Sequence, residues 1–247
     1  MQRLPTRGLL SVLSFVAGLV AVSGQLMVPP NRMVQRAQDV LTGLAGNLTA
    51  VFTIPQLPVY MGAALAGTSV EGDVLADMTW TISTVTGMVQ LQPLVPTKYV
   101  YLQQHNAVVG GIWWQHHDAF AKLIAKHGPR HVIEVGGGHG YLATKLLIGE
   151  KVASWTMVDP NPDHIFQLPT LKVIKGYFET VRKLPPNVDA VVHSHTLEHI
   201  YEPAAFFAQL QRLLAVGSYH IFSTPDMLSL AMSDAPTLHF EHSILMY

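Results

Sequence analysis

The chain has 247 residues, enough for one full α/β domain with a smaller unit beside it. Its net charge is −1 with a pI of about 6.9, so no basic surface indicates a nucleic-acid partner. Cysteine is absent, which excludes disulfides and thiolate metal sites. The 13 histidines are scattered without a His-Glu-x-x-His pair, which argues against a zinc-hydrolase helix.

Residues 1–32 form an apolar N-terminal segment. Arg3 and Arg7 precede an uncharged run from Gly8 to Asn31, the layout of a secretory signal peptide or a short membrane anchor. Two interpretations stay open. The segment is either a targeting or membrane segment, with membrane contact through residues 8–28, or a non-native extension or buried helix, which we favour.

Residues 33–100 are expected to form a small irregular N-terminal module, because prolines at positions 55, 58, 93 and 96 interrupt it. The segments Leu57–Gly62, Asp77–Trp80 and Gly87–Leu91 resemble the N-terminal module of a bacterial C-methyltransferase-like family. Its best-known relatives methylate a carbon of nucleotide-linked keto-sugars. That module carries zinc-binding cysteines, whereas this chain has Leu41–Leu44 at the place of one pair. The resemblance implies a zinc-less module of reduced stability.

A second domain is expected over residues 101–247, and Ile112–Ile124 is predicted to be an amphipathic helix leading into it. The segment resembles the part of the same family that covers the cofactor. We favour core packing for its tryptophans, as for Phe120. Whether His116 or His117 lies at the cofactor mouth stays open.

The most informative stretch is Val132–Leu147. An apolar run ends in a glycine-dense turn and a helix-forming run follows at once, which predicts a buried parallel strand, a tight loop and a helix. Gly136, Gly138 and Gly140 give the pattern G-x-G-x-G. The dinucleotide fingerprint G-x-G-x-x-G would need glycine at position 141, where the chain has tyrosine. Glycine lets a ligand lie against the backbone, beside the N–H groups of the following helix.

This pattern, with Glu134 two positions before the first glycine, resembles motif I of class I S-adenosylmethionine (SAM) methyltransferases. In that family the loop backs the methionine part of SAM, and the acidic side chain lies near its ammonium group. The resemblance implies SAM as the cofactor, bound by Glu134 and by Gly136, Gly137, Gly138 and Gly140. An NAD-dependent oxidoreductase is the alternative that the glycine spacing disfavours.

The rest of the domain alternates strands with helical patterns, which predicts an α/β fold with a doubly wound, mainly parallel sheet. The resemblance implies the Rossmann-like SAM methyltransferase form of this fold. A helix is predicted over Ala205–Leu214. The strands predicted after the glycine loop are Trp155–Val158, Leu171–Ile174, Val188–His193 and Tyr219–Ser223.

Side chains that follow these strands complete the expected cofactor site. Asp159, at the tip of the second strand, suits both ribose hydroxyls of a nucleoside. Pro160 shapes the loop where adenosine would lie. Phe178 either flanks adenine or is buried, and both interpretations stay open. His193 is expected in the region that faces the methyl donor.

The loop after the fourth strand is rich in titratable residues. His193, His195 and His199 with Glu198 would suit a metal ion. We expect no metal, because methyl transfer needs a base and positioning more than a metal, and we interpret Glu198 and His199 as opening the next helix. His195 is expected near the reacting methyl group.

The tail segment Asp234–Ser243 is similar to the C-methyltransferase family's aromatic/His-x-Glu-His motif. A histidine of that motif is proposed to take the proton next to the ketone, and the matching position here is His242, with Glu241 beside it. Histidine, with an unperturbed pKa of about 6.5, suits that task. His239 stands where the family often has tyrosine. The resemblance implies His242, His195 and Glu241 as catalytic residues, with a purely structural Glu241 as the alternative.

The sequence therefore predicts a SAM-dependent methyltransferase with a small-molecule acceptor, and a nucleotide-linked sugar as the finer expectation. Class I methyltransferases add two more strands, so the domain is expected to be truncated at its C-terminus. An inactive SAM-binding or structural relic of the fold is the alternative. Because SAM is a cytosolic metabolite, we expect a cytoplasmic protein, with a membrane-anchored form as the alternative.

Overall fold

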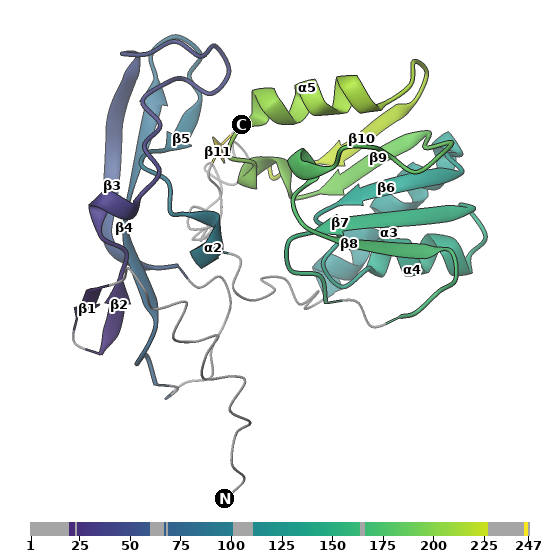
Figure 1. The fold of residues 1–247 in the computed structure, drawn as a ribbon, viewed down its shortest axis with the longest axis horizontal. Coiled ribbons are helices and arrows are strands. Elements are labelled where there is room, and N and C mark those ends of the chain that lie inside the picture. The colour runs from purple at the N-terminus through teal and green to yellow at the C-terminus, as the bar shows by residue number, and fades with distance from the viewer. Residues whose placement is uncertain are drawn as a thin grey trace, which may run out of the picture. The chain divides into compact units, whose positions relative to one another are not determined.

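The chain divides into two compact units, one of residues 1–39 and 44–100 and the other of residues 40–43 and 101–247. The computed structural model describes residues 20–22, 24–59, 67, 69–100, 111–163, 166–226 and 245–246. Figure 1 shows a β-sheet in the first unit and a sheet with helices in the second. The division after Val100 falls where the sequence analysis begins the second domain.

The first unit is built on a mixed sheet around strand β4 (Val74–Ser83). Strands β3 (Leu48–Pro58) and β5 (Val89–Leu91) pair antiparallel with β4. Strand β2 (Gln25–Met27) pairs parallel with β4 and antiparallel with β1 (Val20–Val22). The unit is thus more regular than its prolines suggest, because the long strand β3 includes Pro55 and Pro58, and the long strand β4 lies between Pro58 and Pro93 along the chain.

The core of the first unit surrounds Trp80, which is fully buried and stacks on Phe52 at a ring-centroid distance of 4.8 Å. The unit also holds two short helical turns: η1 (Pro30–Arg32) lies between β2 and β3 along the chain, and α2 (Thr97–Val100) follows β5. Leu94 is also fully buried. Apolar packing therefore supports this unit within the described residues.

The second unit holds five parallel strands in the order β10-β9-β6-β7-β8. The chain runs outward from β6 through β7 to β8, then crosses to β9 and continues to β10. The winding direction changes between β6 and β9, so the carboxyl ends of these two strands form a topological switch point. The prediction of a doubly wound parallel sheet is confirmed. The strands are β6 (His131–Val135), β7 (Ser154–Asp159), β8 (Leu171–Lys175), β9 (Ala190–Ser194) and β10 (Tyr219–Ser223).

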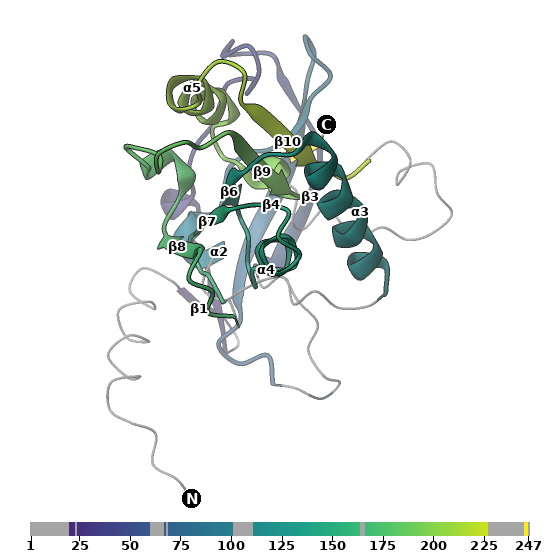
Figure 2. The ribbon, with the colours of Figure 1, turned by 90° about the vertical axis from the view of Figure 1, so that its right-hand side faces the viewer.

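Helices cover both faces of this sheet (Figures 1 and 2). Alternate side chains of a strand point to opposite faces, so Val132 packs with Ile124 of α3 while Ile133 packs with Phe206 of α5. Each face therefore has its own apolar core. On one face lie α3 (Gly111–His127) and α4 (Tyr141–Ile148), and on the other α5 (Pro203–Leu213) with the turns η2 (Phe178–Thr180) and η3 (Leu197–His199).

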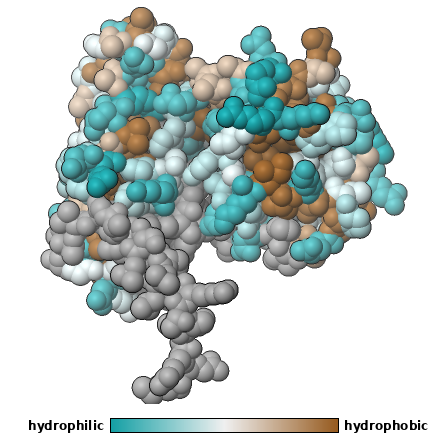
Figure 3. Space-filling view, viewed as in Figure 1, coloured by the Kyte–Doolittle hydropathy of each residue, from teal (hydrophilic) through white to brown (hydrophobic). Residues whose placement is uncertain are grey.

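The last described element is the short strand β11 (Leu245–Met246). Within the described residues, no helix combines the length and the apolar character needed to cross a membrane. Residues 1–19, which carry most of the predicted membrane segment, lie outside the described residues. The space-filling view in Figure 3 shows hydrophobic areas mixed with hydrophilic ones over the viewed face.

Candidate functional site

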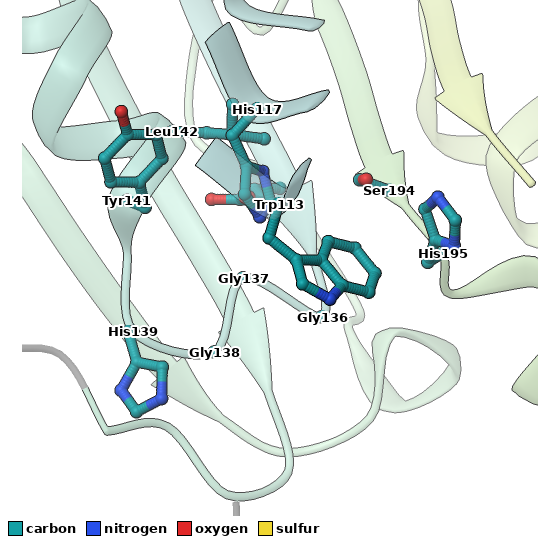
Figure 4. A pocket seen from close by; sticks show the side chains of 11 residues that line it. Trp113, His117, Gly136, Gly137, Gly138, His139, Tyr141, Leu142, Ser194 and His195 are labelled. Atoms are coloured by element: carbon teal, nitrogen blue, oxygen red, sulfur yellow. The ribbon is translucent and has the colours of Figure 1, made fainter. Parts of the chain in front are cut away.

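A pocket opens in the second unit at the carboxyl ends of β6 and β9, where the winding changes direction (Figure 4). Its empty volume is about 550 Å³, open solvent included. Helix α3, the glycine loop after β6, the first turn of α4 and the loop after β9 form its walls. The lining residues are Trp113, His117, Glu134, Gly136, Gly137, Gly138, His139, Tyr141, Leu142, Ser194 and His195.

The floor is the glycine loop, and two of its glycines are required by close contacts. A Cβ on Gly136 would lie 2.7 Å from Thr196 Oγ1, and the backbone φ there is +74°. A Cβ on Gly137 would lie 2.5 Å from Met157 Cγ and 2.7 Å from Glu134 Oε2. All three distances are shorter than real Cβ contacts. The glycines therefore let the loop lie tightly against β7 and the loop after β9.

Glu134 reaches the pocket from the end of β6 with a buried carboxyl group. Its Oε2 accepts a hydrogen bond of 2.9 Å from Trp155 Nε1. Burial raises the pKa of Glu134 to about 7, the Trp155 hydrogen bond opposes this shift, and the nearby charge of Asp159 adds to it. Near neutral pH this group is therefore divided between a neutral and an anionic form. A cation in the pocket would favour the anion.

Asp159, at the end of β7, is buried and holds the backbone of two loops. Its Oδ2 accepts a hydrogen bond from Gly138 N–H at 2.9 Å, and its Oδ1 accepts one from Asn161 N–H at 2.7 Å. Half-buried Pro160 stands between Asp159 and Asn161 in the chain. Asp159 is not among the residues that line the pocket. In this structure its carboxylate fixes the position of the glycine loop.

Two ring nitrogens at the pocket are buried and have no hydrogen-bond partner among the described residues. They are His117 Nδ1 on α3 and His139 Nε2 in the glycine loop. The other nitrogen of His139, Nδ1, bonds the carbonyl oxygen of Asp163 at 2.9 Å. Burial, followed by the charge of His116, lowers the pKa of His117 to about 4, so this ring is neutral. Unpaired buried polar atoms are costly, and a polar ligand would satisfy both.

The wall beside β9 is built from aromatic rings in edge-on contact, of which Figure 4 shows Trp113 and His195. Trp113 meets His195 at a centroid distance of 5.1 Å, and His116 meets His195 edge-on at 4.8 Å. His195 has a φ of +50°, an uncommon conformation for a residue other than glycine. His116 Nε2 lies 2.7 Å from Ser194 Oγ. This wall therefore presents both aromatic surface and hydroxyl groups.

Behind this wall, Glu198 of η3 is buried between two histidines. Its Oε1 lies 3.8 Å from His195 Nδ1 and 3.9 Å from His199 Nε2. Burial raises the pKa of Glu198 to about 7. Within the described residues, no group of three or more His, Asp or Glu side chains is arranged to hold a metal ion. Glu198 is close enough to influence the orientation of His195.

The structure brings part of the predicted site together and separates the rest. Glu134, Gly136, Gly137, Gly138 and His195 line the pocket. Gly140, with a φ of 70°, is the N-cap of α4. His242 and Glu241, with the whole predicted tail motif, lie outside the described residues.

Phe178 and His193 are buried on the α5 side of the sheet and do not line the pocket. Phe178 packs on Phe206 at a centroid distance of 5.4 Å, which matches the buried alternative and leaves no open face for adenine. His193 is fully buried, and its Nε2 lies 2.9 Å from His220 Nε2. Because side chains alternate along a strand, the neighbouring Ser194 faces the pocket in place of His193.

Several lining residues were not predicted, and Trp113 was expected in the core. Trp113 and Trp114 lie in the first turn of α3, before the buried residues of that helix begin at Phe120. Trp113 is half-buried and lines the pocket, while Trp114 is 46% exposed. The hydrophobic pattern of α3 could not tell a residue of the pocket wall from a residue of the core, because either role places an apolar side chain on the same face of the helix.

Together these features define a doubly wound α/β protein with its ligand site at the topological switch point. Residues 114–243, more than half of the chain, match the family described as "Methyltransferase domain". The chain belongs to this methyltransferase-domain family.

Individual relatives are more distant. A protein of Mycolicibacterium smegmatis described as a "Probable S-adenosylmethionine-dependent methyltransferase" is 24% identical over 120 residues, covering 47% of each chain. This chain thus spans about half the length of that curated relative. Among solved structures, the plantazolicin methyltransferase BpumL in complex with SAH has a TM-score of 0.42 at 15% identity, covering 52% of this chain and 55% of that one. The N-methyltransferase NodS of Bradyrhizobium japonicum has a TM-score of 0.39 at 17% identity, covering 48% and 72%.

Proposed function

We propose that the second unit binds SAM in the pocket between β6 and β9 and transfers its methyl group to a small molecule. The observation that carries this proposal is the buried Glu134 carboxyl group above a glycine loop that Cβ atoms would disrupt. Membership in the methyltransferase-domain family and the name of the mycobacterial relative support it.

The lining residues fit the two ends of such a cofactor. Glu134 would hold the ammonium group of the methionine part, since a cation compensates its buried charge. The unpaired nitrogens of His117 and His139 would bond the polar groups of the ligand. For Asp159 to bind the ribose hydroxyls, as the sequence predicts, its carboxylate must share its oxygens with the two backbone N–H groups it already accepts. A carboxylate has enough lone pairs for this.

Bound SAM would supply an activated methyl group, and the chain would supply position. The rings of Trp113 and His195 border the side of the pocket next to Ser194, so an acceptor there would be confined against the methyl group. Holding two reactants in the right geometry accounts for a large share of such catalysis. A nucleotide-linked sugar as acceptor, methylated on carbon with His242 as base and Glu241 beside it, is the finer form of the proposal. It rests on the resemblance of the N-terminal and tail segments.

The test is calorimetric titration of the full chain with S-adenosylhomocysteine (SAH), the product form of the cofactor. We expect micromolar binding, lost in a Glu134→Ala, Asp159→Ala double variant. Glu179→Ala, which alters an exposed carboxylate of η2 away from the pocket, is the matched control and should bind like the wild type. NADH in the same assay should not displace SAH.

Circular dichroism of each variant separates loss of binding from loss of folding. A folded wild-type chain that binds no SAH would refute the proposal and leave a structural relic of the fold. Displacement of SAH by NADH would support the alternative, an NAD-dependent oxidoreductase. SAH binding without methyl transfer to any acceptor would support an inactive SAM-binding protein.

A further inference from the structure

A polar cluster of three side chains lies beside the pocket, at the carboxyl ends of β9 and β10. Ser223 Oγ donates a hydrogen bond of 3.0 Å to Ser194 Oγ, and Ser194 Oγ lies 2.7 Å from His116 Nε2. Ser223 Oγ is 3.5 Å from the same ring nitrogen. Ser194 also lines the pocket. The cluster thus connects the pocket to an imidazole on α3 through one hydroxyl group.

The surroundings of His116 favour its neutral form. Burial lowers the pKa of His116 below its ordinary value of 6.5. The titratable groups that face it are two histidines, His117 on its own helix and His195 on the loop after β9, at centroid distances of 5.4 and 4.8 Å. Its remaining ring neighbours are Trp113 and Phe120, which carry no charge. At neutral pH this ring can therefore take up a proton.

We propose that His116 accepts, through Ser194, the proton that the acceptor loses when it is methylated. This rests on the proposed function, and it takes His116 as the base in place of His242, which the finer form of that proposal names. Ser194 would touch the acceptor, while His116 is a positioning and proton-accepting residue behind it. The acceptor class that this arrangement suits carries a removable proton on the reacting atom, either a hydroxyl group or a carbon next to a carbonyl. Tertiary amines and thioethers have no such proton.

Methyl transfer and proton transfer are coupled in this arrangement. An electron pair on the acceptor atom X, either a hydroxyl lone pair or the pair that a C–H bond leaves when it gives up its proton, forms the X–CH₃ bond. The S–CH₃ bond of the donor breaks at the same time, and the electron pair of that bond stays on sulfur. The acceptor proton moves to Ser194 Oγ as the serine's own proton moves to His116 Nε2. The positive charge of the sulfonium is thereby replaced by that of the imidazolium, which later returns its proton to water. Ser223 continues to donate to Ser194 throughout.

The first measurement is long-range ¹H–¹⁵N NMR of histidine side chains in the full chain at pH 7, with and without saturating SAH. His116→Gln assigns the signal. We expect His116 to be neutral with Nε2 unprotonated, and we expect Ser194→Ala to shift the Nε2 signal while Ser223→Ala shifts it less. A charged His116, or a ring whose Nε2 carries the hydrogen, cannot accept the proton and would overturn the inference.

The second measurement is transfer of labelled methyl from SAM to catechol and to acetoacetate, as hydroxyl and carbon-acid probes, against dimethyl sulfide as a probe without a removable proton. General-base removal typically costs about a hundredfold or more, so His116→Gln should lower kcat that much and flatten the acidic limb of the pH profile, with KM for SAM unchanged. His127→Gln, at the exposed end of α3, is the matched control. Wild-type kcat and pH profile in His116→Gln, or transfer to dimethyl sulfide alone, would refute the inference.

The two proposals fail in different ways. Absence of SAH binding by folded wild-type protein refutes the proposed function itself. SAH binding with His116 in the wrong protonation state refutes only the role of the cluster.

Discussion

Replacing Glu134 by glutamine tests the buried acid at the centre of the site. Glutamine keeps the size of the side chain and an oxygen that can accept the 2.9 Å hydrogen bond from Trp155. The substitution removes the carboxyl group, so the side chain no longer binds or releases a proton. In the unfolded chain this carboxyl group loses its proton near its ordinary pKa of 4.5, whereas in the folded chain burial raises that pKa to about 7.

The sign of the effect follows from the proton count. Between these two pKa values the folded state holds a proton that the unfolded state has released, so the free energy of unfolding falls as the pH rises. The loss is complete above the folded pKa. At about 1.4 kcal/mol per pH unit, the shift corresponds to about 3 kcal/mol. Glu134→Gln should therefore match the wild type near pH 4 and exceed it by about 3 kcal/mol near pH 8.

The assay is urea unfolding at four pH values from 4 to 8, followed by tryptophan fluorescence. Glu179→Gln, an exposed carboxylate in η2, is the control and should differ little from the wild type at any pH. Taking the difference between two chains cancels the contributions of the other buried groups, among them Glu198. A stability difference that stays constant over this range would refute the assignment of the raised pKa to Glu134.

Three other substitutions test the loop and the core. Gly137→Ala places a Cβ 2.5 Å from Met157 Cγ and should destabilise the chain by about 1–3 kcal/mol in urea unfolding, whereas Gly111→Ala, with nothing within 4 Å, should not. Asp159→Asn keeps one acceptor for two backbone N–H groups and should weaken SAH binding at least about tenfold by calorimetry, because tenfold is about 1.4 kcal/mol and an unsatisfied group costs about 1–3 kcal/mol; unchanged affinity would contradict its role. Phe178→Ala should cost about 3–5 kcal/mol of stability while leaving SAH affinity intact, and a selective loss of affinity would return Phe178 to the cofactor site.

The sequence could predict those elements whose signals are local. The strand expected at Tyr219–Ser223 is β10 with the same bounds, because a short β-branched and aromatic run between turn residues has few alternatives. The glycine loop was recognisable because positive φ and close contacts leave little choice of residue. By contrast, β3 and β4 of the first unit pair across residues 59–73, which give no local sign of the pairing.

Which side chain at the end of β9 faces the pocket could not be predicted from the sequence, for a different reason. The choice between His193 and Ser194 depends on the register of one strand against its neighbours, and a shift of one residue exchanges the two faces. His193 attracted the functional interpretation because of its chemistry, yet it packs against Phe206 under α5. The unpaired nitrogens of His117 and His139 depend on contacts between α3, the glycine loop and Asp163, which no motif encodes.

The two buried acids at the ends of β6 and β7 differ in the hydrogen bonds that their carboxyl groups accept. Asp159 receives two backbone N–H donors, which hold its charge in place and tie the glycine loop to the end of β7. Glu134 receives one donor, from Trp155, and is otherwise buried. Its negative charge is therefore costly until a cation enters the pocket.

A cationic ligand that binds there stabilises the ionised form, lowers the pKa of Glu134 and releases a proton. SAH should accordingly bind the wild type more tightly as the pH rises from 6 to 7.5, and this gain should be absent in Glu134→Gln. A site of this kind selects its ligand by charge at one end and by fit to the glycine backbone along the floor.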